Sequence, residues 1–199
     1  MPTFSLRTRI APLAVATALV GGLVATTTAV APDAHAASGS YYLYFKKNTS
    51  NPINSKLYLM KSVANAKDKV VARYRAGSGN GSQNECATNK GWLPGTNTKN
   101  GKYKIEFHRT NFDGIINGYV IKLSDKKCTQ GDKRTKRTAL FVHSEMKPNG
   151  KQGTIESERW DGTRDYYSNG CIKLKPADIK DLFAKAKRYG WPKTLYVVK

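Results

Sequence analysis

Short runs rich in β-branched and aromatic residues recur along the chain from residue 41 onward. In "KYKIEFH" the apolar side chains fall at every second position, which is typical of a strand with one buried face. Stretches such as "GSGNGSQN", "PGTNTKNG" and "PNGKQG" separate the runs and favour turns. The predicted strands are Tyr41–Phe45, Lys56–Lys61, Lys69–Arg75, Lys102–His108, Gly118–Leu123, Thr138–His143 and Thr194–Lys199.

One segment near the C-terminal end, "PADIKDLFAKAKRYG", has helical spacing instead. Pro176 suits a first helical position, and Gly190 and Pro192 provide the stop. Acidic side chains lie early in this segment and basic ones late, as the helix dipole favours. The predicted buried stripe consists of Ile179, Leu182, Phe183 and Ala186. The hydrophobic pattern therefore predicts a mainly β domain with one substantial helix.

The first 36 residues have the composition of a targeting segment rather than of a folded domain. Arg7 and Arg9 precede an almost wholly apolar or small run from Ile10 to Val30, and "AHA" follows at residues 34–36. This order is typical of a secretory signal peptide with an A-x-A cleavage site, although the same run is long enough for an uncleaved membrane anchor. We expect residues 1–36 to be removed and residues 37–199 to form a single exported domain without a membrane span.

The chain is strongly basic, with 34 lysines and arginines against 14 acidic residues and a formal net charge of +20. The lysines are spread along the whole chain rather than gathered in a tail. A basic exported protein can bind nucleic acid, or it can lie among anionic wall polymers or phospholipid headgroups. Charge alone does not choose between these partners.

Three cysteines divide into a candidate pair and a remainder. Cys86 and Cys128 lie in polar, loop-like surroundings suited to a disulfide, which export permits. Such a bridge stabilises the fold by about 3–4 kcal/mol on the chain-entropy model. Cys171 is then a free thiol, and its role is the main functional question.

Cys171 and His143 together suggest nucleophilic chemistry. His143 ends the apolar run "TALFVH", a position that holds an imidazole rigidly and exposes it. A nearby imidazole turns a thiol into a useful nucleophile by taking its proton. Gly170 permits close backbone approach, and the amides of Gly170 and Cys171 offer an oxyanion hole. The alternative is an inert, buried cysteine. His108 is expected to face solvent, and with so few candidate ligands we expect no metal site.

The stretch "SNGCIKLKPADIKDLF" resembles the S-x-G-C-I-[R/K]-[L/M]-x-x-x-D signature of the L,D-transpeptidase (YkuD-type) catalytic domain. "FVH" at Phe141–His143 is similar to the family's upstream histidine motif, and "GWLPGTNTKNGKYKI" to its proline-glycine lead-in to a strand. The resemblance covers roughly residues 41–199 and is densest over 138–183. The signature positions that match are Ser168, Gly170, Cys171, Ile172, Leu174 and Asp178.

This resemblance implies a β-sandwich or barrel-like domain that acts on peptidoglycan stem peptides and needs no cofactor. By analogy, Cys171 would attack the carbonyl between the third stem residue and the following D-alanine. His143 would serve as general base and then general acid, and Ser168 would orient it. Gly170 and Cys171 would supply oxyanion donors. The acyl group would pass to a neighbouring stem's amine or, in an L,D-carboxypeptidase, to water.

Several positions depart from the family pattern. Asn169, which we expect to contact the substrate, occupies a position that is often histidine, and this excludes a mechanism with two histidines. Ser144 replaces a glycine after His143. Lys173 replaces an arginine, so a substrate carboxylate would meet a point charge rather than a bidentate fork. The insert "KPNGKQGTIESERWDGTRDYY" carries Arg159 and Trp160, and is either a substrate-facing flap or a solvated loop.

A different class of function fits the same composition. A secreted basic module with a non-catalytic Cys171 would bind wall polymers or nucleic acid, and aromatic residues do interleave with lysine in "YYLYFKK" and "KYKIEF". The same alternation is that of plain strands, so we expect no nucleic-acid partner. The expected partners are peptidoglycan stem peptides and anionic wall polymers, and the expected form is a monomer associated with the cell wall.

Overall fold

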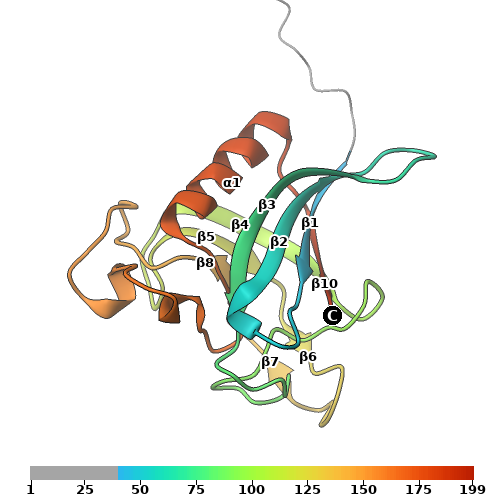
Figure 1. Ribbon diagram of the computed structural model, residues 1–199, viewed down its shortest axis with the longest axis horizontal. Coiled ribbons are helices and arrows are strands. Elements are labelled where there is room, and N and C mark those ends of the chain that lie inside the picture. Colours follow the sequence, from blue (N-terminus) through green and yellow to red (C-terminus); the bar gives the residue numbers. More distant parts are fainter. Residues whose placement is uncertain (1–39) are drawn as a thin grey trace, which may run out of the picture. The chain divides into compact units, whose positions relative to one another are not determined.

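The computed structural model describes residues 40–199, so the predicted signal peptide and its cleavage site lie outside the described residues. Eight strands form a closed barrel in the order β1-β10-β4-β5-β8-β9-β3-β2, and β6 and β7 pair separately (Figure 1). The barrel strands are β1 (Tyr41–Lys46), β2 (Ser55–Lys61), β3 (Lys69–Ser78), β4 (Lys102–Phe112), β5 (Gly118–Leu123), β8 (Phe141–His143), β9 (Ile172–Lys173) and β10 (Thr194–Val198). The remaining elements are β6 (Lys126–Lys127), β7 (Lys136–Arg137) and the 3₁₀ turns η1 (Pro52–Asn54), η2 (Glu156–Glu158) and η3 (Arg164–Tyr166).

Most neighbouring strands of the barrel are antiparallel, but two pairs are parallel. β1 pairs with β10, placing Leu43 opposite Leu195, and β8 pairs with β9, placing His143 opposite Lys173. Alternate residues of each strand point inward, so Leu43, like Leu195, is fully buried in the core. The expectation of a mainly β, barrel-like fold is confirmed.

Helix α1 (Pro176–Tyr189) is the only α-helix among residues 40–199. Its four buried residues, Ile179, Leu182, Phe183 and Ala186, are those of the predicted stripe. In Figure 1 the helix packs against the barrel beside β3, where the Tyr74 hydroxyl donates to Asp181 at 2.8 Å. The Phe183 ring also packs edge-on against Tyr119 of β5, at 4.9 Å between ring centres.

Each predicted strand overlaps a strand of the barrel, but their lengths differ. β3 and β4 extend to Ser78 and Phe112, while the run predicted over 138–143 is a strand only from Phe141. The predictions omitted β6, β7 and β9 because each is two residues long, too short for an alternation pattern. Their pairing is imposed by the surrounding chain.

A disulfide joins Cys86 to Cys128, whose Cα atoms lie 5.5 Å apart. Cys128 follows β6, so the bridge ties the β6–β7 ribbon to the loop between β3 and β4. Among the cysteines, Cys171 is free and partly exposed. In the part of the chain that the structure describes, no helix is both long and apolar enough to cross a membrane.

Candidate active site

An open cavity of about 480 Å³ lies beside the parallel pair β8 and β9. It brings together five of the residues singled out in the sequence, while Phe112, Ile116 and Phe141 add apolar wall. The five are His143, Ser168, Asn169, Cys171 and Lys173. His143 ends β8 and Cys171 immediately precedes β9, so two short paired strands carry the candidate base and nucleophile to one place.

The Cys171 loop is shaped by hydrogen bonds to Ser168. The Ser168 hydroxyl donates to the Cys171 carbonyl at 2.6 Å and accepts from the Gly170 and Gly79 amides at 3.2 and 3.1 Å. This differs from the expectation that Ser168 orients His143, because its hydroxyl is engaged by the loop backbone. The Gly170 amide is likewise engaged by Ser168, which removes it from the expected oxyanion donors.

His143 is buried and its ring is oriented by the backbone of the next residue. Its Nδ1 lies 2.9 Å from the Ser144 carbonyl oxygen. A carbonyl only accepts, so this contact requires the proton on Nδ1 and leaves the Nε2 lone pair available as a base. Burial first, and then the positive charge of Lys173, lower the pKa of His143 to about 4. The imidazole is therefore neutral at physiological pH.

The Cys171 thiol is also neutral in the resting site. Its Sγ contacts the Ala139 carbonyl oxygen at 3.5 Å. Burial raises the pKa of the Cys171 thiol, and a hydrogen bond with the Phe141 backbone, followed by the charges of Arg137 and Lys173, offsets this effect only in part. A thiol with a raised pKa beside an imidazole with a lowered pKa gives an uncharged pair rather than a thiolate and imidazolium. Proton transfer must then accompany nucleophilic attack.

Arg137, which was not predicted from the sequence, contacts the backbone of the loop that carries Cys171. The side chain is 3% exposed and its guanidinium donates to three backbone carbonyls. These are the carbonyls of Glu85, Trp92 (3.2 Å) and Asn169 (2.7 Å). Nothing marks this arginine among the other basic residues in the sequence, because its partners are backbone atoms from distant segments.

The family model for the L,D-transpeptidase catalytic domain (YkuD) matches residues 53–197, which is most of the chain. This match decides the family. The chain belongs to the L,D-transpeptidase catalytic domain family. The family acts on cell-wall peptidoglycan, which indicates extracellular or wall association for this L,D-transpeptidase domain. No curated protein matches the chain.

The predicted substrate-binding residues of this L,D-transpeptidase domain divide into two groups. Lys173 and Asn169 line the cavity, but the Lys173 ammonium forms a largely buried ion pair with Glu145. The ammonium is thus paired with a carboxylate of the protein itself, and its positive charge also lowers the pKa of His143.

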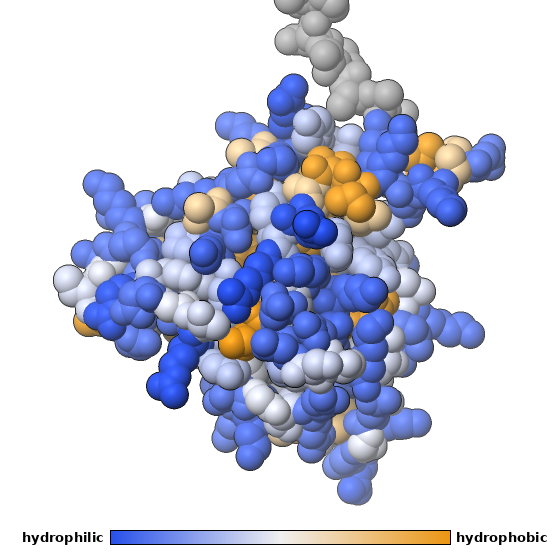
Figure 2. Space-filling model, in the orientation of Figure 1, coloured by the Kyte–Doolittle hydropathy of each residue, from blue (hydrophilic) through white to orange (hydrophobic). Residues whose placement is uncertain are grey.

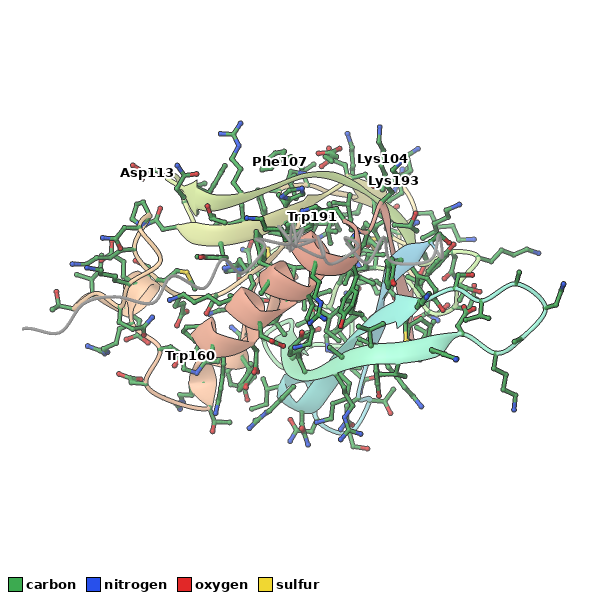
Figure 3. All side chains as sticks on the ribbon, turned by 90° about the horizontal axis from the view of Figure 1, so that it is seen from above. Lys104, Phe107, Asp113, Trp160, Trp191 and Lys193 are labelled. Carbon is green, nitrogen blue, oxygen red and sulfur yellow. A yellow bond between two sulfur atoms is a disulfide. The ribbon has the colours of Figure 1, made fainter. Side chains whose placement is uncertain are left out.

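Arg159 and Trp160 do not line the cavity that contains Cys171. Arg159 pairs with Glu156 at 2.9 Å and with Asp161 at 2.5 Å, and the Trp160 ring packs edge-on against Tyr166. Figure 3 shows Trp160 near one end of α1, in the insert that follows β8. These contacts hold the two side chains within or beside their own loop.

Proposed function

We propose that this protein is a secreted, wall-associated L,D-transpeptidase that joins peptidoglycan stem peptides through a thioester at Cys171. The observation that carries the proposal is the shared cavity of Cys171 and His143, together with the Ser144 contact that leaves Nε2 of His143 free. Membership of a peptidoglycan-acting family supports the substrate class.

In the first half-reaction the Cys171 sulfur attacks the carbonyl carbon between the third stem residue and D-alanine. His143 Nε2 takes the thiol proton as the sulfur–carbon bond forms. The imidazolium then returns that proton to the departing D-alanine amine when the carbon–nitrogen bond breaks. The products are free D-alanine and a thioester that holds the shortened stem.

In the second half-reaction a side-chain amine of a neighbouring stem attacks the thioester carbonyl. His143 accepts a proton from the amine, a new amide bond forms, and the proton returns to the leaving sulfur of Cys171. We assign the developing oxyanion to the Cys171 amide, because the Gly170 amide is already engaged by Ser168. Water in place of the amine would give L,D-carboxypeptidation instead.

The neutral resting pair suits this role. An imidazolium could not accept the proton that the attacking thiol must give up, because its Nε2 is already protonated. Neutral His143 can accept this proton. Ser144 stabilises the imidazolium that forms during each half-reaction, because its carbonyl accepts from Nδ1. Lys173 opposes that charge and so favours return of the proton to the leaving group.

The test is incubation of the protein with a tetrapeptide-stem muropeptide, read by intact-protein and product mass spectrometry. We expect an acyl adduct and released D-alanine with the wild type, and neither with Cys171→Ala. His143→Ala should abolish turnover, whereas His108→Ala is its matched control because His108 lies on β4 outside the cavity. A product heavier by one stem means transpeptidation, and a free tripeptide stem means carboxypeptidation.

Turnover by Cys171→Ala at the wild-type rate would refute the thioester. An untouched substrate with both proteins would favour a binding module with a non-catalytic cysteine.

A further inference from the structure

A row of tyrosines crosses the outer surface of the barrel. Tyr44 of β1 lies opposite Tyr58 of β2 on one side and Tyr196 of β10 on the other. The row ends in cations, because Tyr196 lies opposite Lys102 of β4 and Tyr58 lies opposite Arg73 of β3. Aromatic side chains therefore occupy three adjacent strands at one level, with a positive charge at each end.

These rings are partly exposed while the residues beside them in sequence are buried. Leu43 and Phe45, on either side of Tyr44, point into the core. The rings of Tyr44 and Tyr58 lie 6.2 Å apart at 62°, and Tyr42 meets Tyr196 edge-on at 5.5 Å. The face in view in Figure 2 is mostly hydrophilic with small apolar patches.

A groove of about 1240 Å³ lies over the part of this row formed by Tyr44, Tyr196 and Lys102, and it is larger than the cavity that contains Cys171. Its aromatic lining is Tyr41, Tyr42, Tyr44, Tyr189, Trp191 and Tyr196, and its basic lining is Lys99, Lys102 and Lys193.

The charges of the groove are unequal. Asp68 is its acidic member, and this carboxylate is held by the Tyr42 hydroxyl at 2.5 Å and the Val63 amide at 3.2 Å. Across residues 40–199, none of the ion pairs involves the three groove lysines. The groove thus combines aromatic rings with ammonium groups that no carboxylate neutralises.

The groove is separate from the cavity that contains Cys171. Lys102, at the start of β4, lines the groove, and Phe112, at the end of β4, lines the cavity. Ten steps of a strand span roughly 33 Å. Figure 3 shows the same separation, with Lys193 and Trp191 near Lys104 and Asp113 at the other end of β4. A single stem peptide at Cys171 cannot fill the groove, whereas a polymer can reach both.

We propose that the groove binds a sugar-bearing polymer with phosphodiester charges, which would hold the enzyme against the wall. This proposal rests on the proposed function, which places the enzyme at the cell wall, where such a polymer would be present. Apolar C–H faces of sugar rings gain from burial against aromatic rings, and hydroxyl groups of the tyrosines hydrogen-bond to sugars. Lysines bind phosphate as point charges, and Lys99, Lys102 and Lys193 line the groove.

Single-stranded nucleic acid is the competing partner, and the ring geometry disfavours it. Successive bases stack on exposed ring faces that follow the strand. Here the rings of Tyr42 and Tyr196 meet at 86° and those of Tyr44 and Tyr58 at 62°, while Tyr41 and Tyr189 lie 19° from parallel, so the rings present mixed edges, faces and hydroxyls. Such a surface suits the shorter apolar patches of a sugar.

The test is equilibrium binding of a glycosylated polyol-phosphate polymer, measured by tryptophan fluorescence and by co-sedimentation at low and high salt. Two variants probe the groove: Lys99→Ala/Lys102→Ala/Lys193→Ala for its charge and Tyr44→Ala/Tyr196→Ala for its rings. The matched charge control has the same net charge as the groove lysine variant, because it removes three exposed lysines that lie outside the groove. It is Lys133→Ala/Lys151→Ala/Lys187→Ala.

We expect affinity to weaken by about tenfold or more in each groove variant, to fall with added salt, and to stay near wild type in the charge control. Cys171→Ala should bind as the wild type does, and all groove variants should still process a short soluble muropeptide. These two arms separate the groove from the catalytic proposal. The lysine variant changes only exposed side chains, so it keeps the test valid if the tyrosine variant unfolds.

Four results would overturn the proposal. Equal loss in the charge control would assign binding to diffuse charge. Tighter, groove-dependent binding of single-stranded DNA would assign the groove to nucleic acid, and equal binding of polygalacturonate would remove the preference for phosphate. Absence of polymer binding by the wild type would leave the groove without this function.

Discussion

Replacing Arg137 with methionine tests whether a buried cation holds the candidate nucleophile in place. Methionine fills similar space but donates no hydrogen bond. The carbonyls of Glu85, Trp92 and Asn169 would each lose a charged donor. Since Asn169 is two residues before Cys171, the loop that carries the thiol would lose its brace.

The size of the effect follows from these three contacts. A hydrogen bond from a charged group contributes about 1.5–3 kcal/mol, and relief of the guanidinium's own desolvation offsets part of the total. We expect Arg137→Met to lower the free energy of unfolding by about 3–5 kcal/mol. For a domain of this size that corresponds to a melting temperature lower by roughly 6–20 °C. Misplacement of the thiol by about 1 Å would lower turnover on the order of a hundredfold.

The assay combines thermal melting, iodoacetamide alkylation of Cys171 and muropeptide turnover, all measured well below the melting temperature of the variant. Arg137→Lys is the matched control, because it keeps the charge but donates from a single nitrogen, and should be intermediate. Loss of turnover should fall on kcat more than on KM. A melting temperature within about 2 °C of wild type, with unchanged turnover, would refute this account of the buried contacts.

Four further predictions concern the same loop, the base and the disulfide, with two of them on the base. Gly170→Ala should lower both melting temperature and turnover, since the new Cβ would lie 2.2 Å from the buried Arg137 guanidinium and the backbone φ is +113°. Gly81→Ala is the control for backbone strain alone, because its φ is +80° but no atom lies near the new Cβ. Because the pKa of His143 is lowered from 6.5 to about 4, the acid limb of kcat/KM should fall near pH 4, and a limb at 6.5 would contradict the burial argument. The unfolded imidazole takes its proton first, so His143 makes stability decrease as pH falls from 6.5 toward 4, a slope that His143→Gln should remove in denaturant titrations. Cys86→Ala/Cys128→Ala should lower the free energy of unfolding by about 4 kcal/mol, the entropy of a loop with a sequence separation of 42, and an unchanged denaturation midpoint would count against that model.

The sequence was informative where structure depends on local pattern. The helix from Pro176 was predicted with its four buried residues because its spacing, start and stop signals agree. Cys171 and His143 were found because they lie in short contiguous motifs. Arg137 was not, since its partners come from segments that meet only after folding.

The same distinction explains why two side chains make contacts that the sequence did not predict. Ser168 was assigned to His143 by analogy, but its hydroxyl satisfies the backbone of its own tight turn. Lys173 was assigned to a substrate carboxylate because nothing in the spacing of the sequence indicated that Glu145 would neutralise it. The tyrosine row could not be predicted from the sequence either. Alternation shows which residues of one strand point outward, but only the register between strands shows that the tyrosines of three strands lie side by side.

The position of β10 in the barrel also sets the order in which the fold can form. β10 lies between β1 and β4, so the first and last strands of the domain pair directly, and Tyr44 meets Tyr196. Until Thr194–Val198 is available, β1 and β4 each keep an unpaired edge and the barrel cannot close. Contacts so distant in sequence make folding slow, and partly folded chains expose edges that aggregate. The topology therefore delays closure of the barrel until β10 has been synthesised.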